Sequence, residues 1–203
     1  MDYSFDGHAI VSGNLMLPIV GAGTADLFFA EPDAAVEVGH GGELVVLGTT
    51  RYMTVTDAGS DGGYVRARLV SGRGKLDTDL PPLTYNDEIA RYIATSSVGE
   101  AGEVAGTGWD LLSDYCSRWN RTGTLRDALQ RLCRLNDVLH WRVAEDGSLA
   151  LVSETWPDVT EHVDTYLPTQ SHERCAAWWP KSGYISPGHS IEVYGTDRRL
   201  LRV

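Results

Sequence analysis

The chain has 203 residues, of which 42% are hydrophobic and 22% are charged, a balance typical of folded globular proteins. Its 28 acidic and 17 basic residues give a net charge of −11. This charge argues against a general nucleic-acid binder, which presents a basic surface, and against a protein that adheres to anionic membranes. A chain of this length forms one large domain or two small ones, and its core needs no disulfide or metal.

The charge is distributed unevenly along the chain. Residues 1–50 contain seven acidic residues and no lysine or arginine, whereas the remaining 21 acidic residues are nearly balanced by all 17 bases. One interpretation is a solvated acidic face. The other is a surface that matches a basic partner, or that lines a channel to which DNA must not adhere.

Cysteine content and hydropathy bear on the compartment. Cys116, Cys133 and Cys175 form an odd set, and no apolar run approaches the 18 residues of a membrane span. The sequence starts without a secretory leader, so we expect free thiols and synthesis in a reducing cytoplasm, with no stable membrane insertion.

Residues 8–70 contain short apolar runs separated by turn-forming clusters, which predicts several β-strands arranged as a small barrel or sandwich. The segment 64–70 alternates with the period of a half-buried strand. Its expected inner residues are Val65, Ala67 and Leu69, and its expected outer residues are Tyr64, Arg66 and Arg68. Residues 57–63 are predicted to form a hairpin turn or short loop.

A helical part is predicted after the break at Pro81-Pro82. Asn86 is the expected N-cap of a first helix, with Asp87 and Glu88 in its first turn. A second helix is predicted because four bulky or apolar residues recur at helical spacing: Trp109, Leu112, Cys116 and Trp119.

The strongest helix signal begins at Thr124, where Asp127 completes a pattern like a capping box. An apolar stripe from Leu125 to Val138 predicts a helix over 124–138. A hairpin over 139–152 should follow, with its turn at Asp146-Gly147. Residues 154–203 again predict loops and strands.

Known catalytic and metal-binding patterns fit the sequence poorly. Residues 72–75 resemble the end of a phosphate-binding loop but lack its leading glycine and its Ser/Thr. The stretch 172–175, with Cys116 or Cys133, could form a metal site, although zinc sites usually show two close-spaced pairs. Glu100 and Glu103, placed in an expected Gly-rich loop over 97–108, are a weak candidate for a glycosidase pair. No cofactor is expected.

The order of these elements resembles that of the tail hub, or baseplate hub, proteins of tailed bacteriophages. The resemblance covers nearly the whole chain and rests on a set of motifs in order. They are Leu17–Asp26 (LPIVGAGTAD), Val65–Gly74 (VRARLVSGRG), Pro81–Tyr85 (PPLTY), Thr124–Leu129 (TLRDAL), Trp141–Leu149 (WRVAEDGSL) and Pro187–Ile191 (PGHSI). The chain is shorter than many hub proteins.

The resemblance implies an α+β fold that is mainly β, with a small tail-tube-like β-barrel, an inserted helical segment and a helix-plus-hairpin unit. The expected units are a barrel over 1–80, a helical segment and hairpin over 81–153, and a β segment over 154–203. This last segment either completes the barrel or forms part of a second one.

The resemblance also implies a structural, non-enzymatic role in the virion tail. Such proteins form homo-oligomers, typically trimers, whose ring joins the tail tube to the distal spike or fibre proteins and lets DNA pass without sequence-specific binding. The expected contact residues are Trp178, Trp179, Glu100, Glu103, Arg66 and Arg68. Two other functions stay open: a tail-associated cell-wall hydrolase, and a free carbohydrate-binding module that uses Trp178 and Trp179.

Overall fold

Six strands close a β-barrel within the first 71 residues. The computed structural model describes residues 3–18, 20–30, 36–136 and 138–153, and the short stretches 165–166, 179–180, 190–193 and 196–199. The strands are β1 (Tyr3–Phe5), β2 (His8–Met16), β3 (Thr24–Phe29), β4 (Gly41–Val46), β5 (Thr49–Asp61) and β6 (Tyr64–Ser71). Their order around the barrel is β1-β2-β3-β6-β5-β4, and every pair is antiparallel.

The barrel is filled by the alternate side chains that its strands turn inward. Ala25, Leu27 and Phe29 of β3 face Ala67 and Leu69 of β6 in the interior. The predicted alternation of residues 64–70 is therefore confirmed. The predicted turn at 57–63 is too long, because β5 continues to Asp61 after a bulge and only Gly62-Gly63 turns, both with positive φ.

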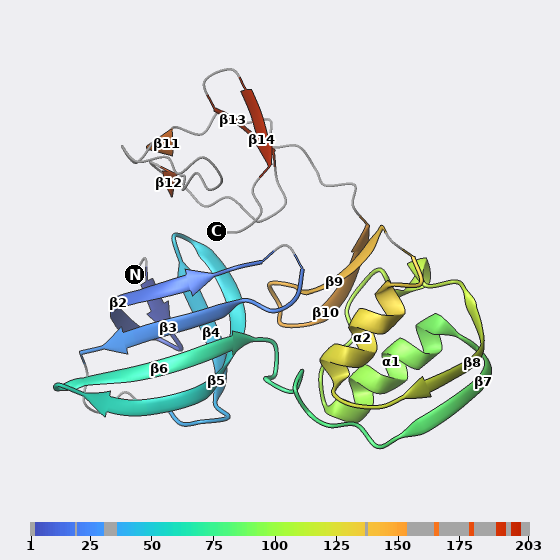
Figure 1. Ribbon diagram of the computed structural model, residues 1–203. Coiled ribbons are helices and arrows are strands. Elements are labelled where there is room, and N and C mark those ends of the chain that lie inside the picture. Colours follow the sequence, from blue (N-terminus) through green and yellow to red (C-terminus); the bar gives the residue numbers. More distant parts are fainter. Residues whose placement is uncertain are drawn as a thin grey trace.

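A second unit follows the barrel and packs around two helices (Figure 1). Its elements are β7 (Leu83–Ile89), α1 (Ala90–Ala101), the 3-10 helix η1 (Trp109–Leu111), β8 (Tyr115–Arg121), α2 (Leu125–Cys133), β9 (Leu139–Val143) and β10 (Leu149–Ser153). β7 pairs with β8, and β9 with β10. The predicted hairpin after α2 is thus confirmed. The helices and both strand pairs share one core.

The first two predicted helices are wrong in part. Asn86 lies in β7, opposite Arg118 of β8, and α1 begins only at Ala90, with no side-chain cap from Ile89. The segment expected as a second helix contains the single turn of η1 and then β8. Strand pairing between β7 and β8, which lie far apart in the sequence, overrides the local helical pattern here.

The helix predicted from Thr124 is confirmed at its start and shorter at its end. The Thr124 side chain accepts from the Asp127 amide and the Asp127 carboxylate accepts from the Thr124 amide, forming the capping box. The helix ends at Cys133, where Leu135 and Asn136 make short-range turn bonds. Leu135 and Val138 are consequently about half exposed instead of lying in the core stripe.

The predicted fold class, mainly β with a small barrel and an inserted helical part, is confirmed. The barrel closes without any strand from beyond residue 71. The described strands after residue 164 pair with one another: β11 (Thr165–Tyr166) with β12 (Trp179–Pro180), and β13 (Ser190–Val193) with β14 (Thr196–Arg199).

Candidate interaction surfaces

Arg66 and Arg68, two predicted contact residues, lie on the outer wall of the barrel and share one carboxylate. The β3–β6 register sets Asp26 opposite Arg68. Arg68 donates to Asp26 from Nε at 3.0 Å and from Nη2 at 3.3 Å, and Arg66 Nη2 lies 3.5 Å from Asp26 Oδ1. The hydrogen bond from Arg68 holds the pKa of Asp26 below its ordinary value. Asp57 of β5 lies opposite Arg68 on its other side and also acts on its charge, so this exposed patch sets two arginines against two carboxylates.

Glu100 is held by a buried arginine of β8. Arg121 is 1% exposed, and its Nη2 lies 2.6 Å from Glu100 Oε2 at the end of α1. The guanidinium also donates to the Pro81 carbonyl, to Tyr85 Oη and to Ser97 Oγ, at 3.0–3.3 Å. Glu100 stays 38% exposed. The expected 97–108 loop is therefore wrong at its start, because residues up to Ala101 belong to α1.

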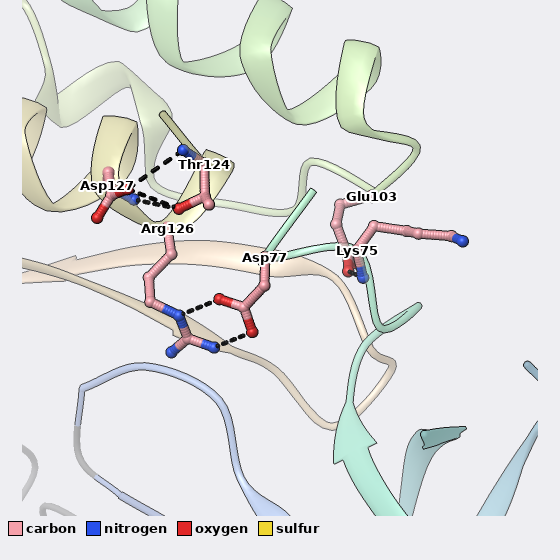
Figure 2. Close-up of polar contacts among 6 residues, drawn as sticks. All are labelled: Lys75, Asp77, Glu103, Thr124, Arg126 and Asp127. Atoms are coloured by element: carbon pink, nitrogen blue, oxygen red, sulfur yellow. Dashed lines mark hydrogen bonds and ion pairs between the residues drawn. The ribbon is translucent and has the colours of Figure 1, made fainter. Parts of the chain in front are cut away.

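Glu103 is buried and orders the glycine-rich loop that leaves the barrel. Its carboxylate accepts from the Arg73 amide at 3.0 Å and from the Lys75 amide at 2.7 Å, and Figure 2 shows it beside Lys75. Gly72 and Gly74 have positive φ, which aims these two amides at one point. The loop that resembles a phosphate cradle therefore holds a carboxylate of its own chain. Glu103 is only 5% exposed, so its buried carboxylate is not available to a partner protein as the sequence predicted.

The segment after this loop is fastened to the start of α2. Arg126 donates to both oxygens of Asp77, at 2.7 and 3.1 Å, next to the Thr124–Asp127 cap (Figure 2). The hydrogen bond from Arg126 lowers the pKa of Asp77, and the capping bonds of Thr124 lower that of Asp127. The Leu125 amide also donates to the Thr78 carbonyl. These contacts hold the chain between the barrel and α2 along a defined path.

The β9–β10 hairpin joins the second unit to the barrel. Gly21 donates to the Trp141 carbonyl and accepts from the Val143 amide, so it forms a one-residue parallel bridge alongside β9. The Tyr52 amide donates to the Glu145 carbonyl, and Arg51 Nη2 lies 3.0 Å from Glu145 Oε1. Figure 1 shows β9 and β10 between the barrel and the helices. The two units thus share backbone hydrogen bonds and not only side-chain contacts.

The geometry gives the two glutamates no shared catalytic role. Glu100 neutralises Arg121 from α1, while Glu103 binds two backbone amides from inside the fold. A glycosidase pair needs both carboxyl groups to face one substrate cleft. Among the described residues, Glu100 and Glu103 are absent from the lining of the pocket at the β9–β10 hairpin and of the pocket beside α2.

The remaining candidates concern cysteine and tryptophan. Cys116 and Cys133 are buried, and burial raises the pKa of Cys133 to about 11. No cluster of three metal-ligating side chains occurs in the described part of the chain. Residues 172–175 and Trp178 lie outside the described residues. Trp179 belongs to β12, opposite Tyr166, and its contact role stays a prediction.

Sequence reasoning missed the two features on which the second unit depends most. Arg121 was not singled out, because the segment before it was predicted as a helix and arginine side chains usually face solvent. Nor was the contact between Arg51 and Glu145 foreseen, since it joins residues 94 positions apart. A weak signal existed for Arg121: it follows Trp119 at the two-residue spacing of one strand face.

No model of a known protein family matches the chain, and no curated protein sequence matches it. Among the described residues, no helix has the length and apolar character needed to cross a bilayer.

Solved structures share its fold at low sequence identity. A 43 kDa tail protein of prophage MuSo2 from Shewanella oneidensis is 15% identical, with a TM-score of 0.53 over 76% of this chain. A tail protein from Neisseria meningitidis MC58 is 14% identical, with a TM-score of 0.50, and the match covers 91% of this chain and 67% of that one.

A third match covers almost the whole chain. The c3393 protein of E. coli, a type VI secretion component described as structurally similar to the T4 phage tail proteins gp27 and gp5, is 11% identical. Its TM-score is 0.64 over 97% of this chain. The chain spans 54% of the Shewanella protein and 66% of the E. coli protein. These matches confirm the predicted fold resemblance to phage tail proteins.

Proposed function

We propose that this chain is a structural protein of a phage tail tip or baseplate hub, where copies form a ring between the tail tube and the distal spike or fibre proteins. The observation that carries the proposal is the fold: a closed barrel followed by a helix-plus-hairpin unit, shared over 97% of the chain with a tail-like protein. A barrel closed by its own six strands is a rigid block with no free strand edge, which suits repetition around a ring.

The outer wall of the barrel supplies the contact that we propose between copies. Arg66 and Arg68 are exposed cations on a barrel whose other described charges are mainly acidic. Exposed acidic residues of the barrel include Asp6, Glu37 and Glu43. The exposed arginines of one copy can therefore meet an acidic surface on the next, which favours a head-to-tail ring. Glu100, Trp178 and Trp179 remain proposed contacts with neighbouring tail proteins.

We divide the chain into three working parts: the barrel over 1–80, the helical segment and hairpin over 81–153, and the segment 154–203. The trimeric state, the passage of DNA through the ring and the acidic lining of its channel all belong to this proposal. An acidic lining would keep DNA mobile by like-charge repulsion. The role is one of assembly, without turnover of a substrate.

Two experiments test the proposal. Immunogold electron microscopy of purified particles, with antibody to this chain, should label the distal end of the tail; absence of the chain from both intact and disrupted particles would overturn the virion role. Sedimentation of the purified chain should show a trimer. The charge reversals R66E and R68E together should convert it to monomer, whereas R91E on α1, an exposed arginine of the second unit, should not.

The non-enzymatic part has its own test. The wild-type chain should release no soluble sugar or peptide from purified bacterial cell wall above a heat-denatured control. Release by the wild type that E100Q or E103Q abolishes would instead establish a hydrolase and refute this part of the proposal.

A further inference from the structure

A pocket of about 440 Å³ lies where the barrel meets the β9–β10 hairpin. Its size falls in the range of ordinary ligand sites. Residues of the barrel and of the hairpin line it together, so it exists only because the two units are joined. The polar and charged side chains among its lining residues are Arg51, Ser71, Arg142, Glu145 and Asp146.

Three of these charged groups already have partners within the chain. Arg51 and Glu145 form an ion pair at 3.0 Å. Asp146 Oδ1 accepts from the Ser148 amide at 2.9 Å and from Ser148 Oγ at 2.7 Å, and these bonds lower the Asp146 pKa. These interactions hold Glu145, Asp146 and the Nη2 of Arg51 to partners within the chain.

Arg142 is different. It lies on the face of β9 opposite the buried Trp141, and Gly21 bridges to it from the barrel side. Its Nε is buried and has no hydrogen-bond partner among the described residues. A buried N–H donor without an acceptor is costly and uncommon, so such a group in a pocket calls for an acceptor supplied from outside. Arg121, the fully buried arginine of the same unit, shows the contrast, because acceptors surround its guanidinium.

We propose that this pocket binds the carboxylate of an acidic peptide segment, with Arg142 as its anchor. A guanidinium presents parallel N–H donors that match the two oxygens of a carboxylate. Glu145 and Asp146 disfavour a phosphate group, because its second negative charge would face these two carboxylates. The volume exceeds that of one carboxylate, so a side chain and its flanking peptide can enter. The proposal is independent of ring formation.

The probe is the capped tripeptide acetyl-Gly-Glu-Gly-amide, titrated into the full ¹⁵N-labelled chain and followed by NMR. The Nε–H signal of Arg142 and the amide signals of Gly21, Ser71 and Glu145 should shift together and saturate. The glutamine analogue of the peptide should bind at least tenfold more weakly, since it lacks the charge. Equal shifts with both peptides would overturn the proposal.

Variants assign the effect to the residue. R142Q should weaken binding roughly tenfold, R142K should retain part of it, and R134Q, an exposed arginine at the end of α2, should match the wild type. E145Q should strengthen binding, because it removes a rim charge and releases Arg51 from its ion pair. If R142Q fails to fold, the stronger peptide binding expected of E145Q still tests the proposal. Unchanged binding by both R142Q and E145Q would refute the site.

The source of the acidic segment is read from sedimentation of the chain alone at increasing concentration. Self-association by the wild type that R142Q reduces would identify the segment as part of a second copy. Peptide binding by a chain whose association R142Q leaves unchanged would identify it as part of another protein. Inorganic phosphate, tested at equal ionic strength, should compete less well than the glutamate peptide; stronger binding of phosphate would overturn the choice of a carboxylate.

Discussion

The barrel of β1–β6 and the second unit, built around α1 and α2, bury their polar groups in different ways. The buried polar residues that the structure describes in the barrel are Ser4, Thr54 and Ser71, which carry only hydroxyl groups. The second unit buries the charged side chains of Arg121 and Glu103. Both charged groups bind backbone of the segments that connect elements: the Pro81 carbonyl, and the amides of Arg73 and Lys75.

This difference teaches how each unit is specified. Inward alternation of apolar residues determines the barrel, and closure satisfies every strand. The second unit has two separate two-stranded sheets and short helices, so its connecting segments need individual polar anchors. Truncation of a buried apolar side chain should therefore lower stability most in the barrel. Substitution of a single buried polar side chain should lower stability most in the second unit.

The largest effect is expected from F29A. Phe29 is fully buried inside the barrel, and its truncation leaves a cavity that closed strands cannot fill by shifting, at a cost of about 4 kcal/mol in the free energy of unfolding. Urea denaturation measures the loss. The control is F28A, the neighbouring residue on the outer face, which should cost about 1 kcal/mol. Equal losses would mean that the barrel interior does not carry its stability.

R121M should come next, at about 3 kcal/mol, because it removes the cation that Glu100, Tyr85, Ser97 and Pro81 share. Hydrogen exchange should show the loss of protection in α1 and β8, with the barrel strands unchanged. R118M, an exposed arginine of the same strand, is the matched control and should stay within about 0.5 kcal/mol of the wild type. Loss of protection spread equally over the barrel would contradict the division into two kinds of core.

These two residues also mark the limits of what the sequence could predict. Phe29 lies in a strand whose alternation is visible locally, and the Thr124 cap and the Asp146-Gly147 hairpin were predicted because each depends on neighbours in sequence. The strand pattern of residues 8–70 left a barrel or a sandwich open, and the resemblance to hub proteins implied the barrel, whose closing pairs join distant strands. Arg121 reaches the Pro81 carbonyl, 40 positions away. No local pattern encodes an acceptor at that distance.

The errors at Asn86 and at residues 109–119 have the same origin. Both segments have local helical signals, and the pairing of β7 with β8 overrides them. Glu103 was predicted as a contact residue because it falls in the Gly-rich loop expected over 97–108. Its inward position depends on the two left-handed glycines at the end of the barrel, which aim amides at it.

E103Q should have a smaller effect, about 2 kcal/mol. Glutamine keeps one acceptor oxygen, but its amide nitrogen faces a backbone N–H and cannot replace the second bond. Exchange of the Arg73 and Lys75 amides should accelerate, and thermal unfolding measures the loss of stability. E43Q, on the exposed side of β4, should leave both unchanged. Unaltered exchange at Arg73 and Lys75 would show that the glycine-rich loop holds its shape without the carboxylate.

The smallest effect is expected from acid, and it should also separate the two units. Folding lowers the pKa of four aspartates below its ordinary value through the hydrogen bonds they accept: Asp77, Asp127 and Asp146, which bond within or beside the second unit, and Asp26 on the barrel. A carboxyl group whose pKa is lower in the folded state stabilises the fold at pH values above its unfolded pKa. That stabilisation is lost as the pH falls through the folded value. The second unit should therefore lose hydrogen-exchange protection first as the pH drops below about 4.

D77N tests the cause, since it removes one of the three groups at its contact with Arg126. The variant should be less stable than the wild type at pH 7, and its stability should fall less steeply below pH 4, because one fewer proton is taken up on unfolding. D26N should flatten the acid response of the barrel strands and leave that of α2 unchanged, since Asp26 bonds to Arg66 and Arg68 of β6 on the barrel wall. If the barrel instead lost protection before α2 in the wild type, the acid sensitivity of this fold would have to arise from groups other than these four carboxylates.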